Sequence, residues 1–176
     1  MKPGLAIFLA SALLLNACAS NPAYMTRAYA EPQSGARARL RVVTTGEIRL
    51  IPGRDCHDEY APGAGVVATQ GYDLADHHLN GRKLGMPDEP ATDQRGTVSE
   101  VFVTAGQPVE VNFISQQIAT GTSNWVCNLK WSFVPEAGKD YVSRSSQSFE
   151  ACSLSVTTLD GQSVGHRDYL NACPAK

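Results

Sequence analysis

The chain has 176 residues, with 15 Lys and Arg against 17 Asp and Glu and a formal net charge of −2. A balance this close to neutral gives no basis for a nucleic-acid partner, which calls for a basic surface. The length fits one domain that can bury a proper core without a metal, and we predict no cofactor.

The first seventeen residues have the three parts of a secretory signal in order. Lys2 precedes a mostly apolar run of eleven residues from Leu5 to Leu15, and the small residue Ala17 comes directly before Cys18. Such a run is too short to span a bilayer, which needs about 20 residues. We therefore predict a signal peptide over residues 1–17.

The end of this signal, Leu15-Asn16-Ala17-Cys18, resembles the lipobox of bacterial lipoproteins. The resemblance implies cleavage before Cys18, a diacylglyceryl group on its thiol and acylation of the new amine. Asn16 departs from the small or β-branched residue usual at its position, and an ordinary signal that leaves Cys18 as a spare thiol is the alternative. Ala19, rather than aspartate, implies transfer to the outer membrane of a Gram-negative cell, with the domain facing the periplasm.

Residues 18–36 are predicted to form the lipidated cysteine and a flexible tether, because they are small and polar and lack sustained periodicity. The folded domain then covers residues 37–176. Arg37, Arg39 and Arg41 alternate at its start and would share one face of a strand. Contact with anionic lipid headgroups is one interpretation of this stripe, and a solvated edge-strand face is the other.

The first strand signals follow at once. The apolar residues from Leu40 to Leu50 keep one phase across Gly46, which predicts one long strand with a bulge or kink at the glycine. A brief strand is expected over 66–68. The segment 63–68 formally fits a dinucleotide-binding fingerprint, but Pro62 before it and the β-branched pair within it favour a glycine turn that leads into a strand.

The central part of the chain predicts a hairpin and one long strand. The runs Val98–Thr104 and Pro108–Ser115 are joined by Ala105-Gly106-Gln107, which has the form of a hairpin. The strand is Asn124–Val134, in which apolar residues alternate with mostly polar ones. The apolar residues would form one face of the strand and are Trp125, Cys127, Leu129, Trp131 and Phe133. We expect both tryptophans to pack in the core rather than to form a carbohydrate platform.

Four cysteines follow Cys18, and an even number in an exported chain predicts two disulfides. Three pairings are possible. A strand begins at Lys139 and another covers Phe149–Thr158, whose inward face carries Cys152. Because Cys127 and Cys152 share the inward face of strands close in sequence, we favour the pairs Cys127–Cys152 and Cys56–Cys173.

About seven short strands with regular turns, and no amphipathic helix of about ten residues, predict an antiparallel β-sandwich, with a small β-barrel as the runner-up. The segment from Phe133 to Tyr141, with its turn at Pro135-Glu136-Ala137-Gly138, resembles an element of immunoglobulin-like folds and of small bacterial lipoproteins. The resemblance implies an immunoglobulin-like sandwich. It also implies that Tyr141 caps a loop through its hydroxyl and is structural rather than catalytic.

Residues 56–96 are rich in proline, glycine and histidine and are expected to form loops between strands, a natural place for a working surface. They hold one cluster of metal-ligand types, which consists of Asp73, Asp76, His77 and His78. On a helical turn Asp73 and His77 would share a face and offer two ligands. A catalytic zinc would need a third ligand, from His57, Asp58, Glu59 or His166, and a polar surface turn ending at Asn80-Gly81 is the alternative.

The common catalytic signatures are absent, since the sequence has no G-x-S-x-G elbow, no H-E-x-x-H and no phosphate-binding P-loop. We expect a non-enzymatic, lipid-anchored binding or structural module on the periplasmic face of the outer membrane. Its expected partners are the membrane, through the lipid, and a protein or cell-envelope component. The alternatives are an inhibitor or immunity protein against a toxin or envelope hydrolase, and a metal-binding protein or metal-dependent enzyme that uses the cluster between Asp73 and His78.

Overall fold

The computed structural model describes residues 26–72, 74–87, 96–119, 124–165 and 172–173. These residues contain the strands β1 (Arg37–Thr44), β2 (Glu47–Pro52), β3 (Gly65–Thr69), β4 (Thr97–Thr104), β5 (Val109–Ile114), β6 (Ile118–Ala119), β7 (Asn124–Trp125), β8 (Asn128–Phe133), β9 (Asp140–Gln147) and β10 (Cys152–Thr158). Within these ranges no helix has the length and apolar character needed to cross a membrane.

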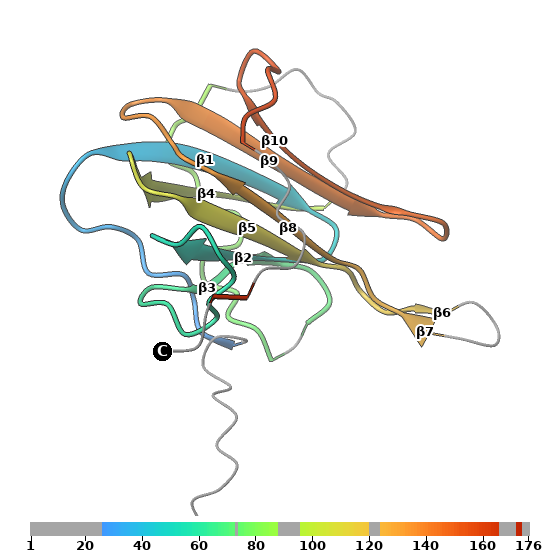
Figure 1. Cartoon of the computed structure of the whole chain (residues 1–176). Coiled ribbons are helices and arrows are strands. Elements are labelled where there is room, and N and C mark those ends of the chain that lie inside the picture. Colours follow the sequence, from blue (N-terminus) through green and yellow to red (C-terminus); the bar gives the residue numbers. More distant parts are fainter. Residues whose placement is uncertain (1–25, 73, 88–95, 120–123, 166–171, 174–176) are drawn as a thin grey trace, which may run out of the picture.

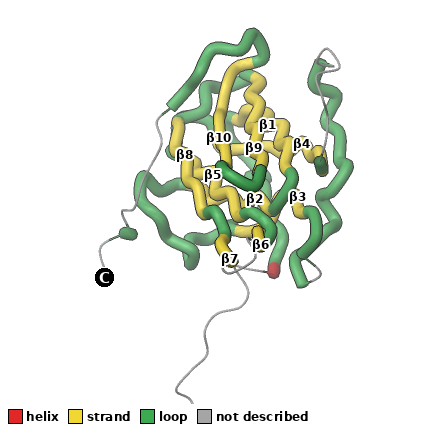
Figure 2. Tube along the Cα trace, turned by 90° about the vertical axis from the view of Figure 1, so that its right-hand side faces the viewer, coloured by secondary structure: helices red, strands yellow, loops and turns green. Residues whose placement is uncertain are grey.

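The strands form a two-layer sandwich (Figure 1, Figure 2). One sheet has the order β10-β9-β1-β4, the other has the order β3-β2-β5-β8, and β6 pairs with β7 in a separate ribbon. The predicted β-sandwich is confirmed, and the barrel is wrong for the described strands because they make two separate sheets. One pair departs from the antiparallel expectation, since β1 runs parallel to β9. The long connection between these strands, which passes through the other sheet, permits that direction.

The chain changes sheets at two places where the sequence predicts continuity or a hairpin. Residues 45–46 carry it from β1 to β2 in the opposite sheet, so the long strand expected over Leu40–Leu50 is wrong. A Cβ at Gly46 would collide with the Ile114 carbonyl oxygen and the Phe113 ring, and glycine alone allows this close crossing. Residues 105–107 likewise lead from β4 to β5, which lie in different sheets and are not a hairpin.

One core fills the space between the sheets. Its largest fully buried apolar side chains come from both sheets and are Phe113, Leu40, Ile48, Leu50, Val42, Val67, Val101 and Val103. Tyr141 packs edge-on against Phe133, with 5.1 Å between ring centroids, and its hydroxyl accepts a hydrogen bond from the Glu136 N–H at 2.9 Å. The structural role expected of Tyr141 at this turn is therefore confirmed.

Both favoured disulfides are present. Cys56 pairs with Cys173 and Cys127 pairs with Cys152, with Cα–Cα separations of 5.0 and 6.3 Å. The first joins the loop after β2 to the C-terminal part of the chain, where the Cys173 N–H also donates to the His57 carbonyl oxygen. The second joins the strand region before β8 to the start of β10.

The segment 27–31, which the sequence assigned to the tether, lies against the sandwich. The Tyr29 N–H donates to the Val66 carbonyl oxygen of β3, and the Val66 N–H donates to the Arg27 carbonyl oxygen. The Tyr29 side chain is buried in the core, and Glu31 accepts hydrogen bonds from the Phe102 N–H and the Arg82 guanidinium. The expected tether is therefore wrong over these residues, because an apolar side chain and backbone pairing hold them. We call residues 27–31 the strap.

Neighbouring segments cover part of each of the four edge strands. The strap covers β3, and the Glu100 N–H of β4 donates to the Arg82 carbonyl oxygen. The Val164 N–H donates to the Val156 carbonyl oxygen of β10, and Gly165 packs directly against Phe133 of β8. Covered edges present fewer unpaired backbone groups to other chains.

Candidate functional site

The expected metal cluster is only partly described, because Asp73 and the further candidate His166 lie outside the described residues, as does Cys18. Asp76 accepts hydrogen bonds from the His78 N–H at 2.9 Å and from the His78 ring at 2.6 Å, and the backbone bond is the main reason that its pKa lies below the usual value. The His77 ring donates to the Tyr72 carbonyl oxygen at 3.0 Å. Where side chains are described, no three His, Cys, Asp or Glu residues gather closely enough to hold a metal.

The arginines at the start of the domain pair within the protein. Arg39 makes a two-point ion pair with Asp140, with both contacts at 2.7 Å, and the Arg41 guanidinium contacts Glu100 at 2.6 Å with both side chains buried. Arg37 lies over the Phe102 ring. Strand β1 is central in its sheet, so the edge-strand interpretation is wrong. The lipid-headgroup interpretation loses its basis because carboxylates already neutralise Arg39 and Arg41.

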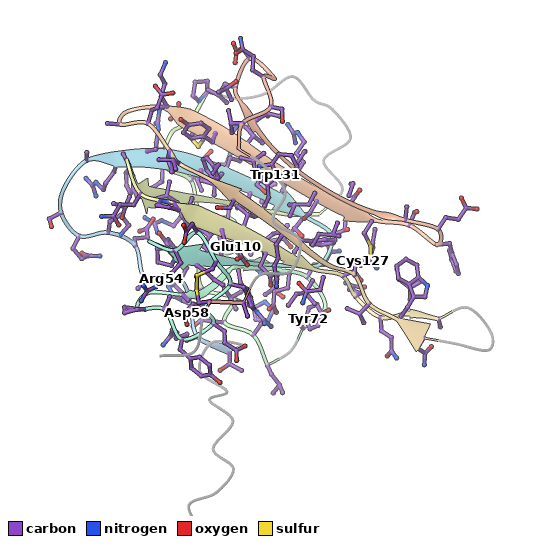
Figure 3. All side chains as sticks on the ribbon, viewed as in Figure 1. Arg54, Asp58, Tyr72, Glu110, Cys127 and Trp131 are labelled. Carbon is purple, nitrogen blue, oxygen red and sulfur yellow. A yellow bond between two sulfur atoms is a disulfide. The ribbon has the colours of Figure 1, made fainter. Side chains whose placement is uncertain are left out.

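A layer of buried polar side chains lies on the outer face of the β3-β2-β5-β8 sheet. The loop after β2 approaches this layer through His57, and the loop after β3 approaches it through Tyr72 and His77. This polar layer consists of Glu47, Arg49, Glu110 and Asn112, each no more than 5 % exposed. Glu47 pairs with Arg49, and burial nevertheless raises the pKa of Glu47 above its ordinary value. Glu110 contacts the His57 ring at 2.9 Å, and this contact joins the loop to the sheet. Figure 3 shows Glu110 on β5 with Arg54 and Asp58 on the loop below it.

The polar layer is suited to holding the loop in place. Glu47 faces Arg49, and Glu110 faces His57 through Oε1, while Oε2 of Glu110 has no hydrogen-bond partner among the described residues. Ile51 makes a small apolar cluster with Ala61 and Ala64 of the loop after β2. Charged groups that are enclosed and paired in this way keep the loop in one position, and they offer little to a ligand from solvent. The sequence did not identify this layer, because the alternation of Glu47 and Arg49 with apolar residues matches an ordinary solvent-facing strand side.

At one end of the sandwich, two hairpins extend beyond the sheets and expose apolar side chains to solvent. Strands β5 and β8 continue as the ribbon of β6 and β7, with a break at Val126–Cys127 that divides the strand expected over Asn124–Val134. The Cys127 N–H donates to the Ser115 hydroxyl at this break. Figure 2 looks at the molecule from the side on which β6 and β7 lie. We call this region, residues 115–119, 124–127 and 147–152, the hairpin end.

The second hairpin of this end, between β9 and β10, has a tight turn over residues 148–151. The Ser148 hydroxyl accepts hydrogen bonds from the Glu150 and Ala151 N–H groups, and the Ser148 N–H donates to the Ala151 carbonyl oxygen. A turn closed by its own serine has little freedom. It presents Phe149 to solvent, with 75 % of the side chain exposed.

Two links fix the hairpins relative to each other. The Cys127–Cys152 disulfide joins their bases, as Figure 3 shows for Cys127, and the Gln147 side-chain oxygen accepts a hydrogen bond from the Gln116 N–H at 2.6 Å. Trp131, beside the disulfide, packs against the core as expected. Its ring N–H donates to the Val164 carbonyl oxygen. Trp125 lies in β7 outside the buried core cluster, so its predicted core position is wrong.

Between the hairpins lies a groove of about 340 Å³. Its lining consists of Gln117, Ile118, Ala119, Gln147, Ser148 and Phe149, none of which is ionisable. Apolar surface and side-chain amides together suit a ligand with apolar side chains and a polar, uncharged backbone. Sequence reasoning missed this groove because it placed Phe149 inside a strand; the serine-closed turn around Phe149 is the signal that it overlooked.

A second hollow, of about 370 Å³, lies beside the strap. Tyr29, Gln107 and three prolines, at positions 32, 52 and 62, contribute to its lining. Arg54 is its one charged lining residue and faces Asp58 at 3.4 Å. The one charged group of this hollow is therefore already paired, and most of the other lining residues named here are prolines, which have no side-chain hydrogen-bonding group.

Neither a protein-family model nor a curated protein matches the chain. Of the two hollows described above, the groove at the hairpin end is the one whose lining combines an exposed aromatic ring with uncharged side-chain amides.

Proposed function

We propose that the protein is a lipid-anchored, non-enzymatic module of the Gram-negative cell envelope that binds an extended, uncharged segment of another protein at the hairpin end. The observation that carries the proposal is the groove between the two hairpins, with the exposed Phe149 on its wall. Exposed aromatic side chains at the centre of a recognition site commonly dominate its binding energy.

The chemistry of the lining supports an uncharged, extended ligand. Gln117 and Gln147 offer amide donors and acceptors to a peptide backbone, and Ile118 and Phe149 offer contacts to apolar side chains. A charged side chain would lose hydration in this groove without meeting an opposite charge. The disulfide and the Gln147 hydrogen bond fix the walls before binding, which reduces the entropy lost when a ligand is held.

The same lining supports binding rather than catalysis. The described lining residues carry no carboxylate, imidazole, thiol or amine, and the one hydroxyl among them, that of Ser148, is engaged in the turn. General acid–base chemistry requires such a titratable group within hydrogen-bonding reach of the substrate.

Envelope location is supported by the two disulfides, which form and persist in oxidising compartments, and by the lipobox-like sequence that ends at Cys18. The test is Cys18→Ser in the full-length protein. The variant is expected to leave the membrane fraction and to lose acyl labelling. Membrane association equal to that of the wild type would contradict the anchor.

The groove is tested by selecting linear peptides from a displayed random library on the purified, oxidised protein. Selected peptides are expected to be uncharged and to alternate apolar residues, and Phe149→Ser should weaken their binding at least tenfold. The matched control is Val134→Ser, which replaces another exposed apolar side chain outside the hairpin end. Selection of charged peptides, or equal losses in both variants, would overturn the groove as the binding site.

A further inference from the structure

The strap fixes where the folded domain begins relative to the lipidated cysteine. The Arg27 guanidinium donates to the carbonyl oxygens of Ala64, at 2.6 Å, and Ala61, at 3.3 Å. With Tyr29 buried two residues later, the chain is attached to the domain from Arg27 onward. Nine residue steps separate Cys18 from Arg27.

This short connection limits the distance between the domain and the membrane. Nine steps reach at most about 30 Å even when fully extended. A flexible coil of that length has a root-mean-square reach of roughly 15–18 Å. The face of the domain that holds Arg27 therefore stays close to the lipid surface, much closer than a tether that ended at residue 36 would keep it.

Two loops share this face with Arg27. In Figure 1 the loop after β2 and the loop after β3 reach the same lower end of the molecule as residues 26–30. Figure 3 shows Asp58 and Tyr72, one from each loop, in this lower half. We call the loops, residues 54–63 and 70–79 as far as they are described, the anchor-side loops.

Each anchor-side loop exposes one large apolar side chain. Tyr60 is 61 % exposed and Leu74 is 86 % exposed, the most exposed of the large apolar side chains described. The Tyr60 N–H donates to the Asp58 side chain, which fixes this part of the loop, and the neighbouring Ala61 accepts the Arg27 hydrogen bond. An aromatic ring with a hydroxyl and a leucine are side chains that favour the interface between headgroups and acyl chains.

We infer that the anchor-side loops rest on the membrane and that Tyr60 and Leu74 enter the lipid interface. This inference rests on the proposed lipid anchor at Cys18. The contact would orient the domain, because a single lipidated residue leaves it free to rotate, whereas two further contacts define which face meets the membrane. The hairpin end, at the side of the molecule in Figure 1, would then remain accessible to a partner.

The charges on this face favour insertion of the Tyr60 and Leu74 side chains into the lipid, rather than attraction of the loops to anionic headgroups. Asp55, Asp58, Glu59 and Asp76 lie in these loops, and the nearby cations Arg27 and Arg54 already contact backbone oxygens and Asp58. Anionic lipids would therefore add no attraction. The contact is expected in zwitterionic vesicles and is expected to persist at high salt.

The test uses the full-length lipidated protein in phosphatidylcholine vesicles whose acyl chains carry bromine, a quencher of tryptophan. Tyr60→Trp and Leu74→Trp each add one indole, and the signal of wild-type Trp125 and Trp131 is subtracted. We expect the added fluorescence of both variants to fall by at least half relative to unbrominated vesicles. The matched control is Phe149→Trp, which places an indole at the hairpin end, at a position whose exposure lies between those of Tyr60 and Leu74, and should show no such loss.

Two results overturn the inference, and they are distinguishable. If the variants float with the vesicles but Tyr60→Trp and Leu74→Trp are quenched no more than Phe149→Trp, the anchor holds and the orientation is wrong. If the wild-type protein carries no acyl label and does not float, the lipid anchor fails and the basis for the orientation fails with it. Flotation is measured before fluorescence, so the two failures are separated on the same samples.

Discussion

Two regions reverse the usual burial of apolar residues and exposure of charged ones. They are the outer face of the β3-β2-β5-β8 sheet and the hairpin end. On the sheet face, Glu47, Arg49 and Glu110 are buried under a loop, whereas the hairpin end exposes Phe149 and Val126 to solvent. A buried charge lowers the free energy of unfolding unless it is paired, and an exposed aromatic ring contributes no burial of apolar surface to stability. The sheet face therefore serves internal stability, and the hairpin end is the region that we propose binds a partner protein.

The largest expected effect is the loss of the disulfide that holds the loop over the polar layer. Replacing Cys56 and Cys173 together by alanine opens a loop closed over a sequence separation of 117 residues. The chain-entropy model gives a loss of about 5 kcal/mol in the free energy of unfolding, against about 3.5 kcal/mol for the Cys127–Cys152 pair. Urea denaturation measures both. A smaller loss for the Cys56–Cys173 pair would show that the loop is held mainly by other contacts.

The polar layer itself is tested with Arg49→Met. This change leaves Glu47 buried without its ion-pair partner and should lower the free energy of unfolding by about 3 kcal/mol. The double variant with Glu47→Leu should recover most of that loss, because an apolar pair of similar volume avoids the cost of a buried charge. Equal stability of the single variant and the wild type would mean that water reaches the layer.

A pH titration extends the comparison to the other sheet, where Glu100 is enclosed by the segment 82–87. Burial alone would raise the pKa of Glu100, but hydrogen bonds from the Leu84 N–H, Arg41 and the Met86 N–H outweigh it and lower the pKa. A carboxyl with a lowered pKa in the folded state stabilises the protein above its unfolded pKa of about 4.3 and loses that contribution as the pH falls through the folded pKa. The stability gap between wild type and Glu100→Gln should therefore shrink below about pH 4; a constant gap would contradict this role.

The smallest expected effect is on stability at the hairpin end. Phe149→Ala should change the free energy of unfolding by no more than about 0.5 kcal/mol, because the ring is exposed. Phe113→Ala, the same substitution in the core, should cost about 3–5 kcal/mol. Both are measured by urea denaturation. A large loss for Phe149→Ala would mean that the ring supports the fold and would weaken its assignment to partner binding.

Local pattern predicted much of this structure and failed where the fold depends on contacts distant in sequence. The alternation around Cys127 and Cys152 favoured the pairing of these two cysteines, and the pair Cys56–Cys173 followed because these two were left. The same alternation could not show that the chain changes sheets at Gly46 and at residues 105–107, since a hairpin turn and a crossing between layers have similar sequences. The strap was missed because Tyr29, the one large apolar side chain among its five residues, has no periodic partner along the chain.

The segments that cover the edge strands lie at different places along the sequence, and their order has a consequence for export. The strap and Arg82, which cover β3 and β4, precede those strands in the sequence, but Gly165, which covers β8, comes far after Phe133. Cys173, the partner of Cys56, comes later still. If the chain is exported as we propose, N-terminus first, the β8 edge stays uncovered until residue 165 has crossed and the Cys56 thiol stays unpaired until residue 173 has crossed. During that interval the exported chain would depend on chaperones and on thiol oxidation in the compartment more than the finished fold does.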